Sequence, residues 1–455
     1  MTGRLLLPRK SALVVAAVGL LAAGCSAAAS GPSPSPGVSF PATPAGHQAR
    51  WLFGAVTHLP IPVGELAAHF DTRFLTAVHP TQLNTDLAGV GSLRLDSITS
   101  SQRTALVFLV TANGTTKLRV SLGVDPQGLI DTLLLQPATT VAPAVPTTWA
   151  GVDQLLRPVA PQIRFLAAQV TGGRCRPIHA IAASTPAPLG SAFKLYVLDA
   201  LARAIAAGRV SWNQRLTVTS GVKSLPSGVL QNDPDGTQVT VRQVAAGMIS
   251  ISDNTAANML IGLLGRPAVE AATRSSGMAN PALDVPFLTT RELFVLKLDD
   301  WPKLADRYLA LNPAGRLALL TGTADRVPLS ALKLTGWTAP RDVGSLEWFA
   351  SPADICRVYA SLSALARQPG LAQVASILQI NSGGIGLSSS QWRPVWFKGG
   401  SEPGVLTLNC LATTRTGQTY VVSALAENPS APIQEATAIP AMLSAIKGAF
   451  QLAAG

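Results

Sequence analysis

The chain has 455 residues, of which 47% are hydrophobic and 13% are charged, and its formal net charge is +11. This length exceeds one ordinary domain and this composition can fill more than one core, so we expect two folded domains. The Lys and Arg residues are scattered and form no stripe, which argues against a nucleic-acid partner and leaves anionic envelope polymers or lipid headgroups.

The first 24 residues predict a lipoprotein signal peptide. Three positive residues within the first ten precede an apolar run over 12–21 that is too short to span a bilayer as a stable helix. The segment 21–25 resembles a bacterial lipobox, although its branched residue stands one place early and Ala22 takes the usual position. We therefore expect secretion, lipidation at Cys25 and anchoring to the outer face of the cytoplasmic membrane. The alternative is a plain secreted protein with a stray cysteine.

Residues 25–46 predict a disordered tether between this anchor and the folded protein. They are rich in Ser, Ala, Pro and Gly, and Pro alternates with Ser within the run 31–37. A stretch of this composition cannot bury enough apolar surface to fold. We expect the first folded domain to begin near His47.

A first domain is predicted over 47–136. Helical spacing covers 51–56 and 63–78, strand patterns cover 92–96, 105–110 and 117–122, and Asn113-Gly114 marks a tight hairpin. Helices followed by an antiparallel sheet make an α+β unit. Their order is similar to that of the cone-shaped folds of the NTF2 and ketosteroid-isomerase type.

The histidines of this domain show no metal-ligand spacing. They are His47, His58, His69 and His79. We interpret them as surface or satisfied core residues, with a small-ligand site as the alternative. If the domain binds a small hydrophobic ligand, we expect a deep apolar pocket lined by residues such as Phe70, Phe74 and Leu109.

A Pro-rich linker over 137–149 leads to a second domain over 150–455. Its predicted helices cover 152–156, 193–207, 240–248, 254–264, 351–365 and 439–453. Its predicted strands cover 165–170, 178–183, 396–398, 406–411 and 420–426. The last three strands are expected to close an antiparallel sheet.

Three cysteines follow the anchor, and no C-x-x-C pair indicates zinc or redox chemistry. An oxidising compartment permits a disulfide. We expect Cys175 to pair with Cys410, because both lie in or beside strand-like segments while Cys356 falls in an apparent helix. The alternative is that all three are buried and reduced.

Three short motifs stand in chain order in the second domain. They are S-x-x-K at 191–194, S-D-N at 252–254 and K-G-G at 398–400. Each motif alone is common, and each alone usually marks a helix, a cap or a turn. The ordered trio behind a secretory signal is instead typical of a serine acyl-transfer site.

The residue types at these positions suit that chemistry. Ser191 is a poor nucleophile without a base, and Lys194 lies one helical turn further on the same face. A lysine that is desolvated beside other cations can lose its proton near neutral pH. The backbone N–H groups of Ser191 and Ser401 are expected to form an oxyanion hole.

The other two motifs supply the remaining roles. Ser252 is placed to relay a proton to the leaving group, and Asn254 can hold both Lys194 and a substrate amide. Lys398 on an edge strand would lower the pKa of Ser252 and attract a substrate carboxylate.

Residues 191–195 and 252–258 resemble the class A β-lactamase and penicillin-binding family of serine hydrolases over about 147–455. The segment 397–404, the small preceding domain and the lipoprotein start are similar to actinobacterial β-lactamase-like lipoproteins related to the two-domain β-lactamase-like protein of clavulanic acid gene clusters. The resemblance implies an NTF2-like domain before a β-lactamase/transpeptidase-like domain with a central antiparallel sheet flanked by helices. It implies no cofactor and no metal. Its implied substrate contacts are Asn254, Gly399, Gly400 and Ser401.

Two departures from the family pattern bear on turnover. Gly399 stands where the family has Thr or Ser, which removes a hydroxyl that would bind a β-lactam carboxylate. No E-x-x-L-N pattern follows the S-D-N motif, and Leu288 falls near the expected deacylating glutamate. The nearest acids are Asp284 and Glu292, and Glu292 is either a hydrolytic base or a structural ion-pair partner within its own loop.

The expected function is therefore an envelope-anchored serine hydrolase that forms an acyl-enzyme at Ser191 with a β-lactam, ester or peptide-like substrate, and is weak as a true β-lactamase. A Ser-His-Asp hydrolase is disfavoured because His179 is the only histidine of the second domain and no G-x-S-x-G surrounds Ser191. The rival is a catalytically idle penicillin-binding or ligand-binding protein. The natural substrate, the fate of the acyl group and the oligomeric state stay open.

Overall fold

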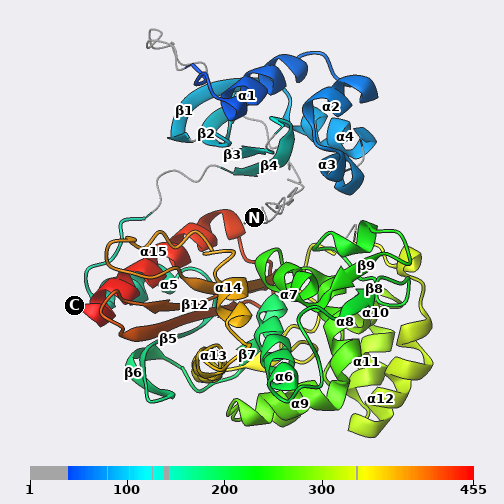
Figure 1. Ribbon diagram of the computed structural model, residues 1–455, viewed down its shortest axis with the longest axis vertical. Helices are drawn as coiled ribbons and strands as arrows, with labels where there is room; N and C mark the ends of the chain where they lie inside the picture. Colours follow the sequence, from blue (N-terminus) through cyan, green and yellow to red (C-terminus); the bar gives the residue numbers. More distant parts are fainter. Residues whose placement is uncertain (1–38, 79, 102, 126, 138–142, 335–336) are drawn as a thin grey trace, which may run out of the picture. The chain divides into compact units, whose positions relative to one another are not determined.

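The computed structural model describes residues 39–78, 80–101, 103–125, 127–137, 143–334 and 337–455. The chain divides near residue 140 into two compact units (Figure 1). The predicted signal peptide, Cys25 and the first part of the tether lie outside the described residues. The tether prediction is wrong at its C-terminal end, because helix α1 (Pro44–Ala55) begins inside it with the Thr43 hydroxyl accepting the Gly46 N–H at 3.1 Å.

The first unit consists of short helices followed by an antiparallel sheet. The helices after α1 are α2 (Val63–His69), α3 (Thr72–Ala77) and α4 (Pro80–Val90). The strands, in the order β1-β2-β3-β4, are β1 (Leu93–Ser101), β2 (Ala105–Ala112), β3 (Thr116–Val124) and β4 (Ile130–Pro137). Asn113 and Gly114 both have positive φ between β2 and β3, which is the conformation that a tight hairpin favours.

Two helix predictions in this unit need correction. The predicted helix over 63–78 is two helices, because Phe70 is extended and the Asp71 carboxylate accepts the Phe74 N–H at 2.9 Å to start α3. Helix α4 was not predicted, since only Leu83 and Leu87 form a buried stripe among poor helix formers. Phe70 pairs with Ile130 of β4, and Leu83 and Leu87 are buried in the core of this unit, so both features depend on distant contacts more than on local propensity.

The apolar pocket that the alternative of a small-ligand site would need is not formed by the three residues suggested for it. Phe70 and Phe74 are fully buried in the core with ring centroids 4.7 Å apart. Leu109 faces the other side of β2, because successive strand residues alternate and Phe108 takes the core side. The three side chains therefore do not line one cavity.

Two of the histidines contact polar neighbours. The His69 ring stacks on Trp51 at 3.8 Å and its Nδ1 lies 2.9 Å from Gln48 Oε1. The His58 ring nitrogen lies 3.8 Å from Glu65. His79 lies outside the described residues.

The second unit is built on a five-stranded antiparallel sheet of order β11-β12-β13-β5-β6 (Figure 1). The strands are β5 (Gln162–Thr171), β6 (Arg174–Ile181), β11 (Trp396–Glu402), β12 (Val405–Thr413) and β13 (Thr419–Glu427). Helices flank the sheet, so the predicted antiparallel sheet between helices is confirmed. The linker prediction runs one residue into α5 (Trp149–Leu156), which Thr148 caps.

Alternation along the strands divides the apolar residues between two cores. Leu411 and Val421 face the larger core, while Cys410 and Val422 face a smaller core beneath α5 and α15 (Glu435–Ala454). Both sheet faces are therefore covered, which explains the continuous apolar runs of β12 and β13.

The larger core joins the sheet to a helical layer. Its helices are α6 (Lys194–Ala206), α7 (Val241–Ser250), α8 (Asn254–Leu264), α9 (Arg266–Ser275), α10 (Thr290–Leu298), α11 (Lys303–Leu309), α12 (Pro313–Gly322), α13 (Pro352–Leu365) and α14 (Gln373–Leu378). Short strands β7 (Ala187–Pro188), β8 (Arg215–Thr217), β9 (Gln238–Thr240) and β10 (Phe349–Ala350) connect them. Helix α6 is buried on nearly every side, as an interior helix requires.

The predicted pairing of Cys175 with Cys410 is wrong. Cys175 is bonded to Cys356 with a Cα–Cα distance of 6.2 Å, and Cys410 is a buried free thiol. Cys410 lies on β12, three strand spacings from β6, or about 14 Å, which no disulfide spans. Helix α13 packs across β6 and brings Cys356 within reach.

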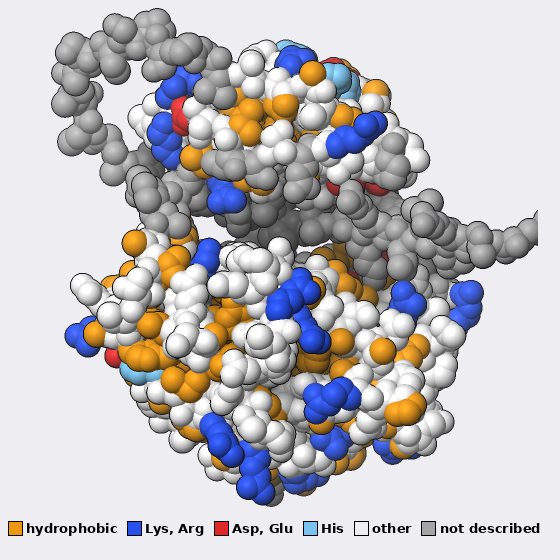
Figure 2. All heavy atoms as spheres, turned by 60° about the vertical axis from the view of Figure 1, so that its left-hand side comes forward, with side chains coloured by type: hydrophobic (Ala, Val, Ile, Leu, Met, Phe, Trp, Pro, Cys, Tyr) orange, Lys and Arg blue, Asp and Glu red, His pale blue; other side chains and the backbone are white. Residues whose placement is uncertain are grey.

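Charge on the surface is dispersed. On the face in Figure 2, Lys and Arg side chains of the larger unit stand in separate groups among neutral side chains. No helix within the described residues is long and apolar enough to cross a membrane. The same part of the chain contains no group of three His, Cys, Asp or Glu side chains that could hold a metal ion.

Candidate active site

The three motifs meet between the helical layer and the edge of the sheet. Ser191 lies in the 3₁₀ turn η1 (Gly190–Phe193) that leads into α6, and the S-D-N motif forms the turn between α7 and α8. The K-G-G motif lies on the edge strand β11. The Lys194 Nζ lies 3.1 Å from Ser191 Oγ and 3.0 Å from Ser252 Oγ, and the Lys398 Nζ lies 3.1 Å from Ser252 Oγ.

The bonds of Lys194 suit a neutral amine. Its Nζ also lies 2.7 Å from the Ser252 carbonyl oxygen and 2.5 Å from Asn254 Oδ1. Both oxygens are acceptors, so they take the two N–H bonds of a neutral amine. The lone pair is then free to accept the hydroxyl proton of Ser191, which is the bond that a general base needs.

Electrostatics favour the same protonation state. Lys194 is fully buried, and burial lowers its pKa well below the ordinary value, with the charge of Lys398 lowering it further and Asp253 opposing. Removing a charged ammonium from water is unfavourable unless its charge is fully paired. Lys194 is therefore suited to take a proton near neutral pH.

A loop over 227–230 holds the S-D-N turn in place. Ser252 has φ +57°, a strained left-handed conformation, and its carbonyl accepts the Ser227 hydroxyl at 2.8 Å. The Asp253 carboxylate caps α8 through the Ala256 N–H at 2.8 Å, and also accepts the backbone N–H groups of the loop at 229–230. Asp253 was not predicted as a site residue, and its signal was the preference of Asp for helix N-caps.

Lys398 faces the proton relay from the strand side. Its side chain is buried, and burial lowers its pKa to about 7. A Cβ at the neighbouring Gly399 would lie 3.0 Å from both the Phe397 ring and the Thr407 carbonyl oxygen. A Ser or Thr at position 399 would therefore require the Phe397 ring or the strand backbone at Thr407 to move.

The backbones around Ser191 and Ser401 touch. A Cβ at Gly400 would lie 2.5 Å from the Ser191 nitrogen, and one at Gly190 would lie 3.0 Å from the Ser401 nitrogen. Only glycines permit so close an approach. The two N–H groups expected to form the oxyanion hole therefore belong to adjoining segments, and Thr407 Oγ1 fixes one of them by donating to the Leu189 carbonyl at 2.9 Å.

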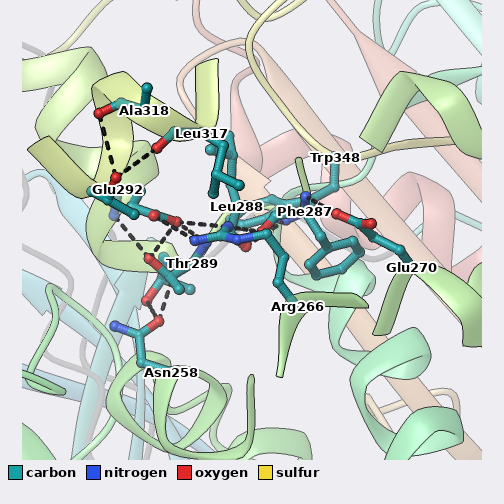
Figure 3. Close-up of polar contacts among 12 residues, drawn as sticks. Asn258, Arg266, Glu270, Phe287, Leu288, Thr289, Glu292, Leu317, Ala318 and Trp348 are labelled. Carbon is teal, nitrogen blue, oxygen red and sulfur yellow. Dashed lines mark hydrogen bonds and ion pairs between the residues drawn. The ribbon is translucent and has the colours of Figure 1, made fainter. Parts of the chain in front are cut away.

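Glu292 is a structural residue, with a partner that differs from the expected one. Its carboxylate pairs with Arg266 of α9 at 2.7 Å, outside its own loop (Figure 3). The same carboxylate accepts the Thr289 N–H at 2.6 Å and the Thr289 hydroxyl at 2.8 Å in a capping box for α10. Glu292 is 1% exposed, and both of its oxygens are used by the scaffold.

The segment before α10 presents no carboxylate to the S-D-N helix. Leu288 is buried, and its carbonyl accepts the Trp348 Nε1–H at 3.1 Å. Asp284 accepts the Phe349 N–H at 2.8 Å, and burial raises its pKa well above the usual range. The group that reaches α8 is the Thr290 hydroxyl, 2.8 Å from Asn258 Oδ1.

Comparison with known proteins gives two family matches and several distant structures. A model of the β-lactamase enzyme family matches residues 152–447, and a model described as the ORF 12 gene product N-terminal region matches residues 40–130. No curated protein matches the chain.

Three of the similar solved structures show how low the sequence identity to this chain is. The β-lactamase of Sphaerobacter thermophilus is 22% identical with a TM-score of 0.47, covering 67% of this chain and 97% of that chain. PBP-A is 18% identical with a TM-score of 0.45, covering 68% and 99%. A β-lactamase of Xanthomonas campestris is 17% identical with a TM-score of 0.46, covering 67% and 96%.

Proposed function

The chain belongs to the β-lactamase enzyme family, and on that premise we propose that it is a serine hydrolase that forms an acyl-enzyme at Ser191 on a β-lactam, ester or peptide-like substrate. One observation carries the proposal. The fully buried Lys194 amine contacts both Ser191 Oγ and Ser252 Oγ while its other bonds go to acceptors.

The proposed reaction uses each of these contacts. Lys194 takes the Ser191 hydroxyl proton as Oγ attacks the substrate carbonyl. The Ser191 and Ser401 N–H groups stabilise the resulting oxyanion. Lys194, once protonated, has a third N–H for Ser252 Oγ at 3.0 Å, and Ser252 passes a proton to the departing nitrogen or oxygen while the acyl group stays on Ser191.

Turnover of a β-lactam acyl-enzyme is proposed to be slow. Glu292 gives both carboxylate oxygens to Arg266 and Thr289 of the scaffold, so it is not free to activate water. Asp284 accepts the Phe349 N–H, and burial raises its pKa well above the usual range, which disfavours the charged form that a general base needs. Gly399 offers no hydroxyl to a carboxylate substrate. These two features favour a weak β-lactamase, with an idle penicillin-binding or ligand-binding protein as the second candidate.

The test is intact-protein mass spectrometry over time after exposure to a fluorescent penicillin and, separately, to an activated ester. We expect an adduct that Ser191→Ala abolishes and that the exposed-serine control Ser430→Ala retains. Decay of the adduct within minutes would mean efficient hydrolysis, and a stable adduct would mean trapped acylation. Absence of any adduct and of ester turnover would leave the ligand-binding protein.

The remaining parts of the proposal concern the rest of the chain. We infer an envelope lipoprotein anchored through Cys25 to the outer face of the membrane, of the actinobacterial β-lactamase-like lipoprotein group. The order of helices followed by a four-stranded antiparallel sheet supports an NTF2-type cone for the first unit. Cys25→Ala is expected to shift the protein from the membrane fraction to the soluble fraction, and unchanged fractionation would refute the anchor.

A further inference from the structure

A buried charge cluster, formed by Lys297, Glu347 and Glu402, adjoins the two backbone segments of the expected oxyanion hole. The Lys297 ammonium on α10 lies 2.5 Å from Glu402 Oε1 and 3.6 Å from Glu347 Oε1. Lys297 is fully buried, and the two carboxylate side chains are 7% and 1% exposed. The sequence motifs gave no indication of this cluster, because its members come from three distant segments.

Each carboxyl group is tied to one of the two segments. Glu347 Oε2 accepts the Gly190 N–H at 3.1 Å, directly before Ser191, and the Trp348 N–H at the same distance. Glu402 directly follows Ser401 on β11. The cluster therefore connects the nucleophile turn to the strand that supplies the second oxyanion donor.

Charge balance favours one proton shared between the two glutamates. Two ionised carboxylates with one lysine would leave a net negative charge in the interior, which is costly. Burial raises the pKa of Glu402 well above its usual range, Lys297 opposes the rise, and the neighbouring Glu347 adds to it. A proton on Glu402, donated to Glu347, makes the cluster neutral.

Among the described residues, Lys297 is the cation that forms an ion pair with Glu347 and Glu402. Asp284 is the other acid that interacts electrostatically with Glu347. Arg341 donates to the Lys297 carbonyl oxygen at 2.5 Å and stacks over Trp301, and these contacts involve neither glutamate carboxylate. Lys297 is thus the cation that holds the two glutamates.

We propose that Glu347 and Glu402 are positioning residues that hold the two segments of the oxyanion hole together by sharing one proton. This inference rests on the proposed acylation at Ser191. Loss of the shared proton places two negative charges in contact, which separates the Gly190 turn from β11. Acylation and local order then fall together as the pH rises.

The glutamine variant separates this role from a purely structural one. Glu402→Gln copies the protonated state, because its carbonyl can accept from Lys297 and its amide can donate to Glu347, yet it cannot titrate. Glu402→Leu has a similar size and can do neither. Glu427→Gln is the matched control, since Glu427 is buried and paired with Arg164 at 2.9 Å on another strand.

The first experiment needs no catalysis. Hydrogen exchange is measured on peptides covering 189–193 and 399–406 in the full-length protein across the neutral to alkaline range. In the wild type and in the control Glu427→Gln, protection of both peptides is expected to fall with rising pH. In Glu402→Leu, protection is expected to be low at every pH. In Glu402→Gln, protection is expected not to change with pH. Equal protection in all four proteins, or the same pH dependence in wild type and Glu402→Gln, would overturn the proposal.

The second experiment uses acylation by the activated ester and the affinity of phenylboronic acid, whose serine adduct places an oxygen in the oxyanion hole. Glu402→Leu is expected to lose about tenfold in both, and Glu402→Gln to restore them to within about threefold. If Glu402→Leu and Glu402→Gln both lose acylation and boronic acid affinity, or if neither variant loses them, the positioning role is contradicted. A wild type that forms no adduct would refute acylation at Ser191, while the exchange data still decide whether the pair holds the segments.

Discussion

Two buried lysines lie on either side of the Ser252 hydroxyl, and their environments assign them different roles. Lys194 contacts the candidate nucleophile, and both burial and the charge of Lys398 lower its pKa, which suits a neutral base. Lys398 contacts Ser252 Oγ and the Gly399 carbonyl, and burial alone lowers its pKa to about 7, so it keeps a proton for substrate recognition below that pH. The same residue type thus serves two functions because of what each amine faces.

The pKa of Lys398 predicts a pH effect that depends on the substrate. Burial lowers that pKa to about 7, so the side chain is charged below this pH and neutral above it. Acylation by penicillin G, relative to acylation by p-nitrophenyl acetate, is expected to fall as pH rises through about 7, because only penicillin carries a carboxylate. The ratio cancels the titration of Lys194, whose depressed pKa affects both substrates. A ratio that is flat from about pH 6 to about pH 9 would contradict this role.

At the scale of elements, the segment from Pro281 into α10 is held from α9. Arg266 and Glu270, one turn apart on α9, bind the carbonyl and the N–H of Phe287 respectively (Figure 3). Arg266 also pairs with Glu292 at the start of α10. The segment is therefore a scaffold element that presents the Thr290 hydroxyl, and no acid, to α8.

Glu292→Gln is expected to lower stability and to leave the acyl-enzyme lifetime unchanged. The variant loses a buried ion pair and weakens the α10 cap, which costs about 1–3 kcal/mol. Denaturant unfolding and the decay of the penicillin adduct measure the two effects. Arg266→Gln is the matched control, because it breaks the same pair and keeps the carboxylate. A lifetime at least about tenfold longer in Glu292→Gln alone would identify Glu292 as the hydrolytic base after all.

At the scale of the whole molecule, the disulfide joins the edge strand β6 to α13 and closes a loop with a sequence separation of 181. Helix α13 also donates the Tyr359 hydroxyl to the Asn409 carbonyl on β12 at 2.8 Å. The cross-link and this hydrogen bond fix the helix across β6, β5 and β13 as far as β12, the strand beside the one that carries Lys398. The disulfide thus holds α13 on the sheet and takes no part in the site.

Replacing both bonded cysteines by alanine is expected to destabilise the protein by about 2–5 kcal/mol, chiefly because the unfolded chain gains freedom across a long loop. Denaturant unfolding measures this change, with Cys410→Ala as the control that removes a buried thiol and no cross-link. Peptide mapping without reduction should recover Cys175 linked to Cys356. Alkylation of Cys175 and Cys356 without prior reduction would contradict the bond between them.

How much the sequence predicted differs between elements. The hairpin at Asn113-Gly114 and the three closing strands were predicted, because turn chemistry and period-two patterns are local. Helix α4, the break at Phe70 and the partner of Cys175 were not, because each depends on contacts with residues far away in the chain. For Glu292, an ion pair was expected, yet its Arg266 partner lies on an earlier helix.

The sequence by itself determined which residue types are available for acyl transfer, since Ser191, Lys194, Ser252, Asn254 and Lys398 stand in motifs of fixed local spacing. Only the tertiary structure decided how those groups meet, because the pKa of a lysine depends on burial and on neighbours from other elements. Only the structure, too, revealed the Glu347–Lys297–Glu402 cluster, the commitment of Glu292 to Arg266 and the bond between Cys175 and Cys356. Charge pairing and desolvation are properties of the packed interior, and no local pattern encodes them.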